Sequence, residues 1–182
     1  MVKGGSGANT GFFIWEKGVV VIDAKMTADA AKQMIEEIKK LTPKPITQLI
    51  ITHSDGDHVS GLGGFPQGVE IISHVQTKKD MAEAFKDPKL QALQPYLPNK
   101  TFTDKMELRL GRERIRILHF GPAHTSGDVV VFFPAEKVAF VGDLVFIGRD
   151  PLIHRQKGGT SLGLVKYLKA LLELRADRYV TG

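Results

Sequence analysis

The chain has 182 residues, of which 42% are hydrophobic and 25% charged, a composition typical of one ordinary globular domain spanning residues 1–182. It contains no cysteine, which excludes disulfides, thiolate metal ligands and a cysteine nucleophile. The net charge of +5 comes from scattered basic residues. This pattern makes nucleic acid an unlikely partner and leaves a small-molecule substrate, anionic or not, as the expected one. No apolar run approaches the roughly 20 residues of a membrane span, and we find no signal-peptide pattern, so a cytoplasmic location is the default expectation.

The first half of the chain predicts strands that alternate with helices. In chain order the pattern predicts strands at 11–15 and 19–23, a helix at 27–41, strands at 46–51 and 69–73, a helix at 76–85 and a proline-punctuated loop at 87–100. Thr27 is placed to cap the first helix. The apolar spacing of that helix predicts a buried face made of Met34, Ile35, Ile38 and Leu41.

The second half turns to strands with short connections, which predict antiparallel pairing. The expected elements are strands at 107–110, 114–120, 129–133 and 137–141, a loop at 147–159, a helix at 161–174 and a last strand from 178. The helix is expected to bury Leu164, Leu168, Leu171 and Leu172. Together the halves predict an α/β (α+β) fold with two sheets face to face and helices outside.

A polar stretch, Thr52 to His58, directly follows the apolar strand at 46–51. It holds His53, Asp55, Asp57 and His58, and ligands gather at strand ends in open α/β sheets. An Asp/Gly turn that merely contains histidines is the plain alternative. Because alternate side chains of an extended turn share a side, the first three side chains are expected to converge. A catalytic tetrahedral zinc takes only three protein ligands and a water, so four such residues in one turn make two metal ions the more natural expectation.

Two later stretches have a similar design. His124 lies in a Gly/Pro loop between strands, and Asp143 follows Gly142 at the end of a strand. A single loop histidine is more often solvated, and a single strand-end aspartate is more often a cap. Their combination with the histidine turn makes both residues candidate metal ligands.

These motifs, His-x-Asp-x-Asp-His over 53–58, Gly-x-x-His-Thr-x-Gly over 121–127 and Gly142-Asp143, resemble the metallo-β-lactamase superfamily. The resemblance implies a four-layer αβ/βα sandwich with a dinuclear site at one edge. It implies that His53, Asp55 and His124 bind the first divalent metal, that Asp57 and His58 bind the second, and that Asp143 bridges them. A metal-bound hydroxide, oriented by Asp57 as the catalytic residue, would attack an ester, thioester or phosphoester.

Two departures from the family pattern affect the expectations. Asp55 stands where the commonest motif has a second histidine. Some branches carry a carboxylate there: the flavodiiron proteins have Glu, and competence-type and choline-esterase relatives have Asp. The added carboxylate leaves zinc as the first expectation and moves the balance toward iron or manganese. The chain also begins at what looks like the family's second hairpin and stops at Gly182, just short of the usual terminal histidine. We therefore expect the first strands and the C-terminal end of the domain to be missing and the second metal site to be weak or empty.

Alternatives to a metallo-hydrolase remain open. Because cysteine is absent and Asp55 is atypical, true β-lactamase activity is not favoured. A di-iron oxidoreductase-like domain and a non-catalytic metal-binding scaffold are the other two hypotheses. His74 and His119 are expected to have packing or rim roles. His154 could face the pocket with Arg149 and Arg155 from the loop after Asp143.

Overall fold

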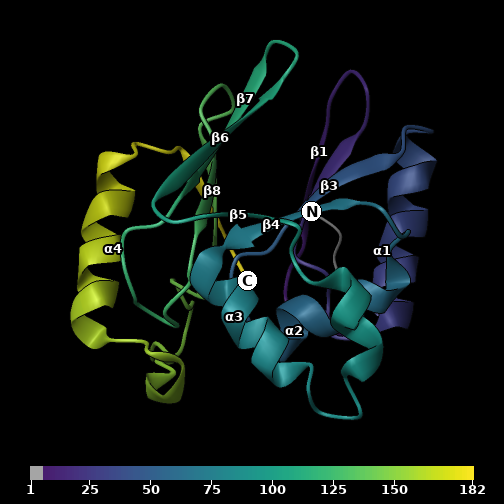
Figure 1. Cartoon of the computed structure of the whole chain (residues 1–182). Helices are drawn as coiled ribbons and strands as arrows, with labels where there is room; N and C mark the ends of the chain where they lie inside the picture. The colour runs from purple at the N-terminus through teal and green to yellow at the C-terminus, as the bar shows by residue number, and fades with distance from the viewer. Residues whose placement is uncertain (1–5) are drawn as a thin grey trace.

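The computed structural model describes residues 6–182, and two five-stranded sheets lie between outer helices (Figure 1). The first sheet follows chain order: β1 (Gly11–Ile14), β2 (Val19–Ile22), β3 (Ile46–Ile50), β4 (Glu70–His74) and β5 (Lys100–Phe102). β1 and β2 form an antiparallel hairpin, and β2 to β5 pair in parallel. The helices α1 (Ala28–Leu41) and α3 (Val75–Ala84) cover this sheet.

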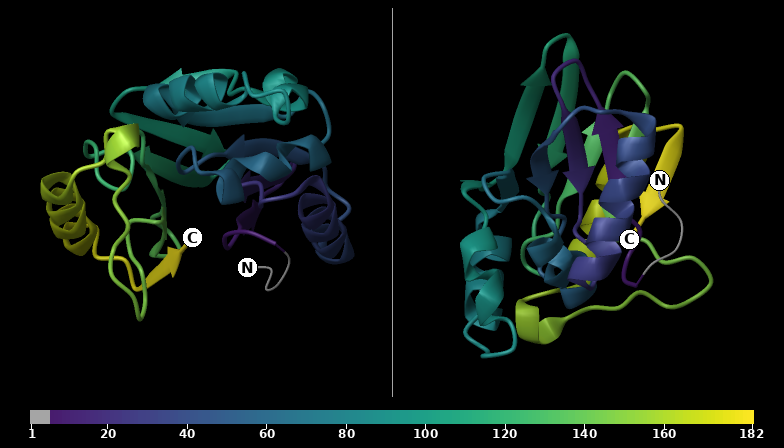
Figure 2. Two further views of the ribbon diagram at one scale, coloured as in Figure 1. Left: turned by 90° about the horizontal axis from the view of Figure 1, so that it is seen from below. Right: turned by 90° about the vertical axis from the view of Figure 1, so that its right-hand side faces the viewer.

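The second sheet has the order β10-β9-β8-β7-β6. Its strands are β6 (Lys105–Leu110), β7 (Glu113–Leu118), β8 (Val130–Phe133), β9 (Val138–Gly142) and β10 (Arg178–Thr181). β6 to β9 are antiparallel, as their short connections predicted, whereas β10 runs parallel to β9. The helix α4 (Ser161–Glu173) covers the outer face, on the side opposite to α1 (Figure 2).

Three apolar layers join these elements into an αβ/βα sandwich, which confirms the expected fold. Along β2, Val19 and Val21 pack toward α1 while Val20 and Ile22 pack toward the second sheet. All four side chains are buried, because this strand lies in the interior of the sheet and has apolar contacts on both faces. The third layer lies between the second sheet and α4.

The first helix begins and packs as its sequence indicates, apart from its last residue. The Thr27 hydroxyl accepts a hydrogen bond from the Ala30 N–H, which satisfies one of the free amides of the first turn. Met34, Ile35 and Ile38 are buried, but Leu41 is 67% exposed, so its predicted burial was wrong. The helix ends at Leu41, so this residue lies at the exposed end of the last turn.

The last helix differs from its prediction in a similar way. It buries Leu164, Tyr167 and Leu171, whereas Leu168 and Leu172 are 39% and 77% exposed. The 3-4 spacing of the three buried residues defines the inner face, and the other two leucines lie on its outer flank. Their predicted burial was therefore wrong.

Shorter elements connect the sheets. They are α2 (Gly56–Val59) and the 3₁₀ segments η1 (Ser60–Gly64), η2 (Gln91–Tyr96) and η3 (Arg155–Lys157). The expected loop at 87–100 therefore contains a 3₁₀ turn and leads directly into the edge strand β5. None of the helices in the described part of the chain is both long and apolar enough to cross a membrane.

Candidate metal centre

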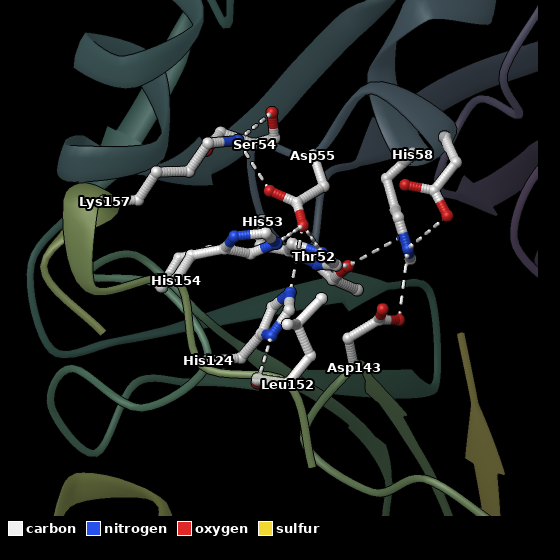
Figure 3. Close-up of polar contacts among 12 residues, drawn as sticks. Thr52, His53, Ser54, Asp55, His58, His124, Asp143, Leu152, His154 and Lys157 are labelled. Atoms are coloured by element: carbon white, nitrogen blue, oxygen red, sulfur yellow. Dashed lines mark hydrogen bonds and ion pairs between the residues drawn. The ribbon is translucent and has the colours of Figure 1, made fainter. Parts of the chain in front are cut away.

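The candidate ligands lie at one edge of the sandwich, where strands of both sheets end (Figure 3). His53 and Asp55 follow β3, and His124 lies in the loop between β7 and β8. Asp143 comes directly after Gly142, the last residue of β9. Gly142 has φ +53°, and a Cβ there would lie 3.0 Å from the Thr52 hydroxyl oxygen. A glycine at this position therefore lets β9 end close against the β3 turn.

The structure brings five of the six predicted ligands into two overlapping groups. His53, Asp55 and His124 form one group, and His53, His58 and Asp143 form the other; within each group the ligand atoms lie within 4.8 Å of one another. Asp55 Oδ2 lies 3.0 Å from His124 Nε2 and 3.6 Å from His53 Nε2, and Asp143 Oδ1 lies 3.2 Å from His58 Nε2. Ligand atoms around a tetrahedral zinc, with bonds near 2.0 Å, are separated by about 3.3 Å. The spacing fits a divalent cation.

Asp57, the sixth predicted residue, is placed differently. Its carboxylate lies 3.8 Å from His58 Nε2, and its side chain is 36% exposed. The alternation of an extended turn, from which convergence was expected, ends at Gly56 because the chain enters α2 there. Asp57 thus stands at the solvent side of the second group rather than inside either of them.

Hydrogen bonds fix which nitrogen of each imidazole faces the centre. His58 Nδ1 donates to Asp23 Oδ2 at 2.8 Å. The Thr52 hydroxyl also donates to Asp23 Oδ2, so its oxygen is free to accept from His53 Nδ1, 3.0 Å away. Both rings therefore direct Nε2 inward, where it is buried without a hydrogen-bond partner, and a neutral ring would present its lone pair there. Buried polar atoms are rarely left unpaired, and a metal ion satisfies such lone pairs.

His124 follows the same pattern. Its Nδ1 donates to the Leu152 carbonyl at 2.8 Å, which directs Nε2 toward Asp55 Oδ2. Burial would lower the pKa of His124, but the contact with Asp55 outweighs it and raises that pKa. The Nε2 proton that bridges His124 and Asp55 occupies the position that a cation would take.

The electrostatics of the second group are similar. Burial alone would lower the pKa of His58, but the negative charges of Asp23 and Asp143 raise it to about 10. Burial likewise would raise the pKa of Asp143, and the interaction with His58 lowers it instead. The imidazoles of His53 and His58, together with the carboxylates of Asp23 and Asp143, thus make a pocket that favours positive charge. These residues fit a divalent metal ion.

Supporting residues that the sequence did not single out hold the ligands in place. Asp23 follows β2 and accepts hydrogen bonds from the Thr52 N–H and hydroxyl as well as from His58. Asp128 accepts from the Thr125 N–H and hydroxyl, which shapes the loop that carries His124. A strand-end aspartate after an apolar run, as at Asp143, is the signal by which Asp23 could have been found.

The remaining histidines divide into two kinds. His74 and His119 stack on each other with ring centroids 3.9 Å apart, which agrees with their expected packing role. His154, expected near the pocket, lies with its Nε2 2.9 Å from Asp55 Oδ2. Arg149, grouped with it in the sequence, stacks on the Phe146 ring instead. Lys157, which no motif had indicated, places Nζ 2.6 Å from Asp55 Oδ1.

Comparison with solved structures identifies the fold class. The chain superposes on a metallo-beta-lactamase from Pontibacter korlensis with a TM-score of 0.79, covering 93% of this chain and 76% of that one at 21% identity. The DIM-1 metallo-beta-lactamase gives a TM-score of 0.77 at 18% identity, covering 96% of this chain and 78% of that one. At these identities the likeness concerns the fold alone.

Sequence comparison then identifies the family. The model of the metallo-beta-lactamase superfamily matches residues 4–182, so the chain belongs to that superfamily. It is 32% identical over 142 residues to a metallo-beta-lactamase type 2 of Elizabethkingia meningoseptica (78% of this chain, 53% of that one). It is 33% identical over 147 residues to the hydroxyacylglutathione hydrolase GloC of Haemophilus influenzae (74% and 66%).

A third relative has a different printed activity. The chain is 26% identical over 169 residues to the 2,4-dinitroanisole O-demethylase subunit alpha of a Nocardioides species, covering 92% of this chain and 49% of that one. The chain thus spans about half to two thirds of the length of these curated relatives.

Proposed function

We propose that this chain is a metal-dependent hydrolase that acts on an ester, thioester or phosphoester, with residues 1–182 working as one domain. The observation that carries the proposal is the inward orientation of three imidazole Nε2 atoms, from His53, His58 and His124, toward two carboxylates. Two of the relatives are named as hydrolytic enzymes of the same superfamily, which supports this class of reaction.

Each residue has a role in the proposal. His53, Asp55 and His124 would hold one ion, His58 and Asp57 would hold a second, weaker one, and Asp143 would serve both. Bound divalent metals lower the pKa of a coordinated water toward neutrality and polarise a carbonyl or phosphoryl oxygen. Asp57 has a partly exposed carboxylate beside His58, so it can accept a hydrogen bond from the attacking water and orient it. Zinc is the first choice of metal, since three of the donors are imidazoles.

β-Lactams are not the favoured substrate of this centre. The chain has no cysteine to serve as a ligand, and a carboxylate at position 55 replaces the usual histidine. An ester, thioester or phosphoester is proposed in their place, and the net charge of +5 favours an anionic substrate such as a phosphoester. Neither a membrane nor a nucleic acid is part of the proposal.

The carboxylate of Asp55 favours a second candidate, a di-iron oxidoreductase. Carboxylate oxygens are harder donors than imidazole and shift the preference toward iron or manganese. Iron that copurifies with the chain, together with turnover of oxygen or nitric oxide, would support this candidate against hydrolysis.

The test is a hydrolysis assay with metal-loaded protein. The chain, loaded separately with zinc, manganese or iron, is offered generic lactam, thioester, carboxylic ester and phosphodiester probes, with and without a chelator. We expect hydrolysis of at least one carboxylic ester, thioester or phosphodiester probe, loss of activity with the chelator and its return with added metal. His124→Ala should abolish the activity, and Lys169→Met, on the exposed face of α4, should retain it. Inactivity on every probe with tightly bound metal would instead support the non-catalytic scaffold.

A further inference from the structure

Both carboxylate oxygens of Asp55 are contacted by one short segment, residues 152–157. His154 Nε2 lies 2.9 Å from Oδ2, and Lys157 Nζ lies 2.6 Å from Oδ1 (Figure 3). Lys157 also donates to the Ser54 carbonyl at 3.4 Å. Each carboxylate oxygen of Asp55 therefore contacts a residue about a hundred positions away in the chain.

A carboxylate can only accept, so His154 Nε2, 2.9 Å from Asp55 Oδ2, is the donor in this contact. The Gln156 side-chain amide lies 3.2 Å from His154 Nδ1, to which it can donate. The ring hydrogen of a neutral His154 is then on Nε2 and points at Asp55 Oδ2. A nitrogen that carries this hydrogen has no lone pair for a metal. His154 is therefore a partner of the carboxylate rather than a further ligand.

Residues 152–157 also form hydrogen bonds with the loop that carries His124. The His154 N–H donates to the His124 carbonyl at 2.8 Å, and the Leu152 carbonyl accepts from His124 Nδ1 at the same distance. The Ser126 N–H donates to the Lys157 carbonyl at 2.9 Å. Two ligands of the proposed first site, Asp55 and His124, are consequently positioned by the same segment.

Charge gives this arrangement a second effect. Burial would raise the pKa of Asp55, but its contacts with His124, His53 and Lys157 hold that pKa far below its ordinary range. As a carboxylate ligand, Asp55 adds one negative charge where an imidazole would add none. The ammonium group of Lys157, in contact with that carboxylate, offsets this charge.

We propose that His154 and Lys157 are positioning residues that hold Asp55 as a one-oxygen metal ligand through Oδ2. Lys157 engages Oδ1 and thereby keeps Asp55 from binding a metal with both oxygens. His154 fixes the orientation of Oδ2, as outer hydrogen-bond partners of metal ligands do. The pair lets an aspartate serve where a neutral imidazole would otherwise stand. This inference rests on the proposed metal centre, and its test measures metal binding without any substrate.

The test uses cobalt(II) as the probe, with affinity measured by competition against a chromophoric chelator and geometry read from the visible spectrum. His154→Leu, which removes the donor, should weaken binding at the first site by about 10-fold or more. His154→Gln offers an N–H at similar reach and should bind within about threefold of the wild type. Lys157→Met should weaken the visible absorption per cobalt, because release of Oδ1 raises the coordination number. Lys169→Met removes an exposed lysine of α4 and should match the wild type.

A double-mutant cycle shows whether the effect passes through Asp55. In an Asp55→Asn background, His154→Leu should have a much smaller effect than in the wild type. Circular dichroism and thermal unfolding of the metal-free variants confirm that each one folds. Wild-type affinity and spectrum in both His154→Leu and Lys157→Met would overturn the inference, as would equal losses in His154→Gln and His154→Leu. A wild-type chain that fails to bind cobalt would overturn both this inference and the proposed centre, whereas tight binding without hydrolysis would count only against the proposed function.

Discussion

Asp23 Oδ2 accepts the Nδ1 hydrogen of His58 at 2.8 Å, and both side chains are fully buried. The same carboxylate accepts from the Thr52 N–H and from the Thr52 hydroxyl, each at 2.8 Å. Through Thr52 it also sets the direction of the His53 ring. One carboxylate at the end of β2 therefore orients two of the three inward-facing imidazoles. Such outer partners fix the tautomer and angle of a metal-binding histidine.

Asp23→Asn should weaken metal binding while leaving the volume of the side chain unchanged. An amide has one acceptor oxygen and cannot accept three hydrogen bonds on two atoms, so one donor would lose its partner. We expect a loss of about 10- to 100-fold in cobalt affinity, as is typical for outer-shell changes. Asp29→Asn changes a side chain that is 89% exposed and should bind as the wild type does. Unchanged affinity in Asp23→Asn would argue against the orienting role.

Asp57→Asn separates catalysis from the first metal site. Since the side chain lies at the solvent side of His58, its replacement should leave the first equivalent of metal bound with unchanged affinity. The hydrolysis rate constant should fall by about 100-fold or more, the range of a lost general base or water-orienting group. Asp177→Asn, at a site 67% exposed, serves as the matched control. Near-normal turnover in Asp57→Asn would exclude Asp57 from the reaction.

His74 should make the metal-free fold acid-sensitive. Burial lowers the pKa of His74 to about 4, and neighbouring His119 and Lys79 add to the shift while Asp104 and the Thr103 carbonyl oppose it. The unfolded chain then binds more protons than the native one between about pH 6.5 and pH 4, so this contribution to stability is complete above pH 6.5 and is lost as the pH falls.

The measurement compares unfolding by denaturant at pH 7 and pH 5 in the presence of a chelator. Between these values the wild type should lose about 2 kcal/mol more unfolding free energy than His74→Asn. Asparagine is chosen because it can still cap α3, where His74 Nδ1 accepts from the Gln76 N–H. An equal pH dependence of the two proteins would show that His74 does not titrate as proposed.

Two glycines of η1 should respond oppositely to alanine. A Cβ on Gly61 would lie only 2.0 Å from the Ala24 carbonyl oxygen. Because that oxygen belongs to the backbone, the main chain itself would have to shift. Gly61→Ala should cost about 3 kcal/mol or more of unfolding free energy, at or above the upper end for overpacking. A Cβ on Gly63 would meet its nearest atom at 3.5 Å, so Gly63→Ala should range from neutral to a gain of about 0.5 kcal/mol. The order of the two melting temperatures tests the prediction, and a Gly61→Ala protein as stable as Gly63→Ala would contradict it.

Local sequence signals predicted most of the fold because they correspond to strong local physics. The run that became β2 is apolar throughout and that of β3 ends in the buried pair Leu49-Ile50, and Thr27 accepts the cap hydrogen bond that its position indicated. The errors concern burial decided by distant packing. Leu41 and Leu172 are as apolar as Ile38 and Leu171 of the same helices, which are buried, yet Leu41 and Leu172 stay exposed. The strand β5 is three residues long with mostly exposed side chains, so it has no apolar periodicity to detect.

The residues of the candidate site also differ in whether local sequence or distant packing determines their position. His53 and Asp143 follow strand ends, His58 lies in the short helix α2 and His124 lies in the loop between β7 and β8. Those positions carry a recognisable sequence pattern. Lys157 meets Asp55 across 102 positions of the chain, and a single lysine in a polar loop gives no sign of such a contact. Asp57 is an intermediate case. Alternation along an extended turn predicted that its side chain would point into the site, but a helical turn begins at Gly56 and changes its direction.

The candidate ligands come from both sheets: His53, Asp55 and His58 follow a strand of the first, whereas His124 and Asp143 follow strands of the second. An ion held among them would act as a cross-link between the two halves of the sandwich. The free energy that keeps the halves together would then include a term set by the concentration of free metal, about 2.7 kcal/mol at one hundred times the dissociation constant. In such an arrangement the supply of metal governs the resistance of the chain to unfolding as well as its chemistry.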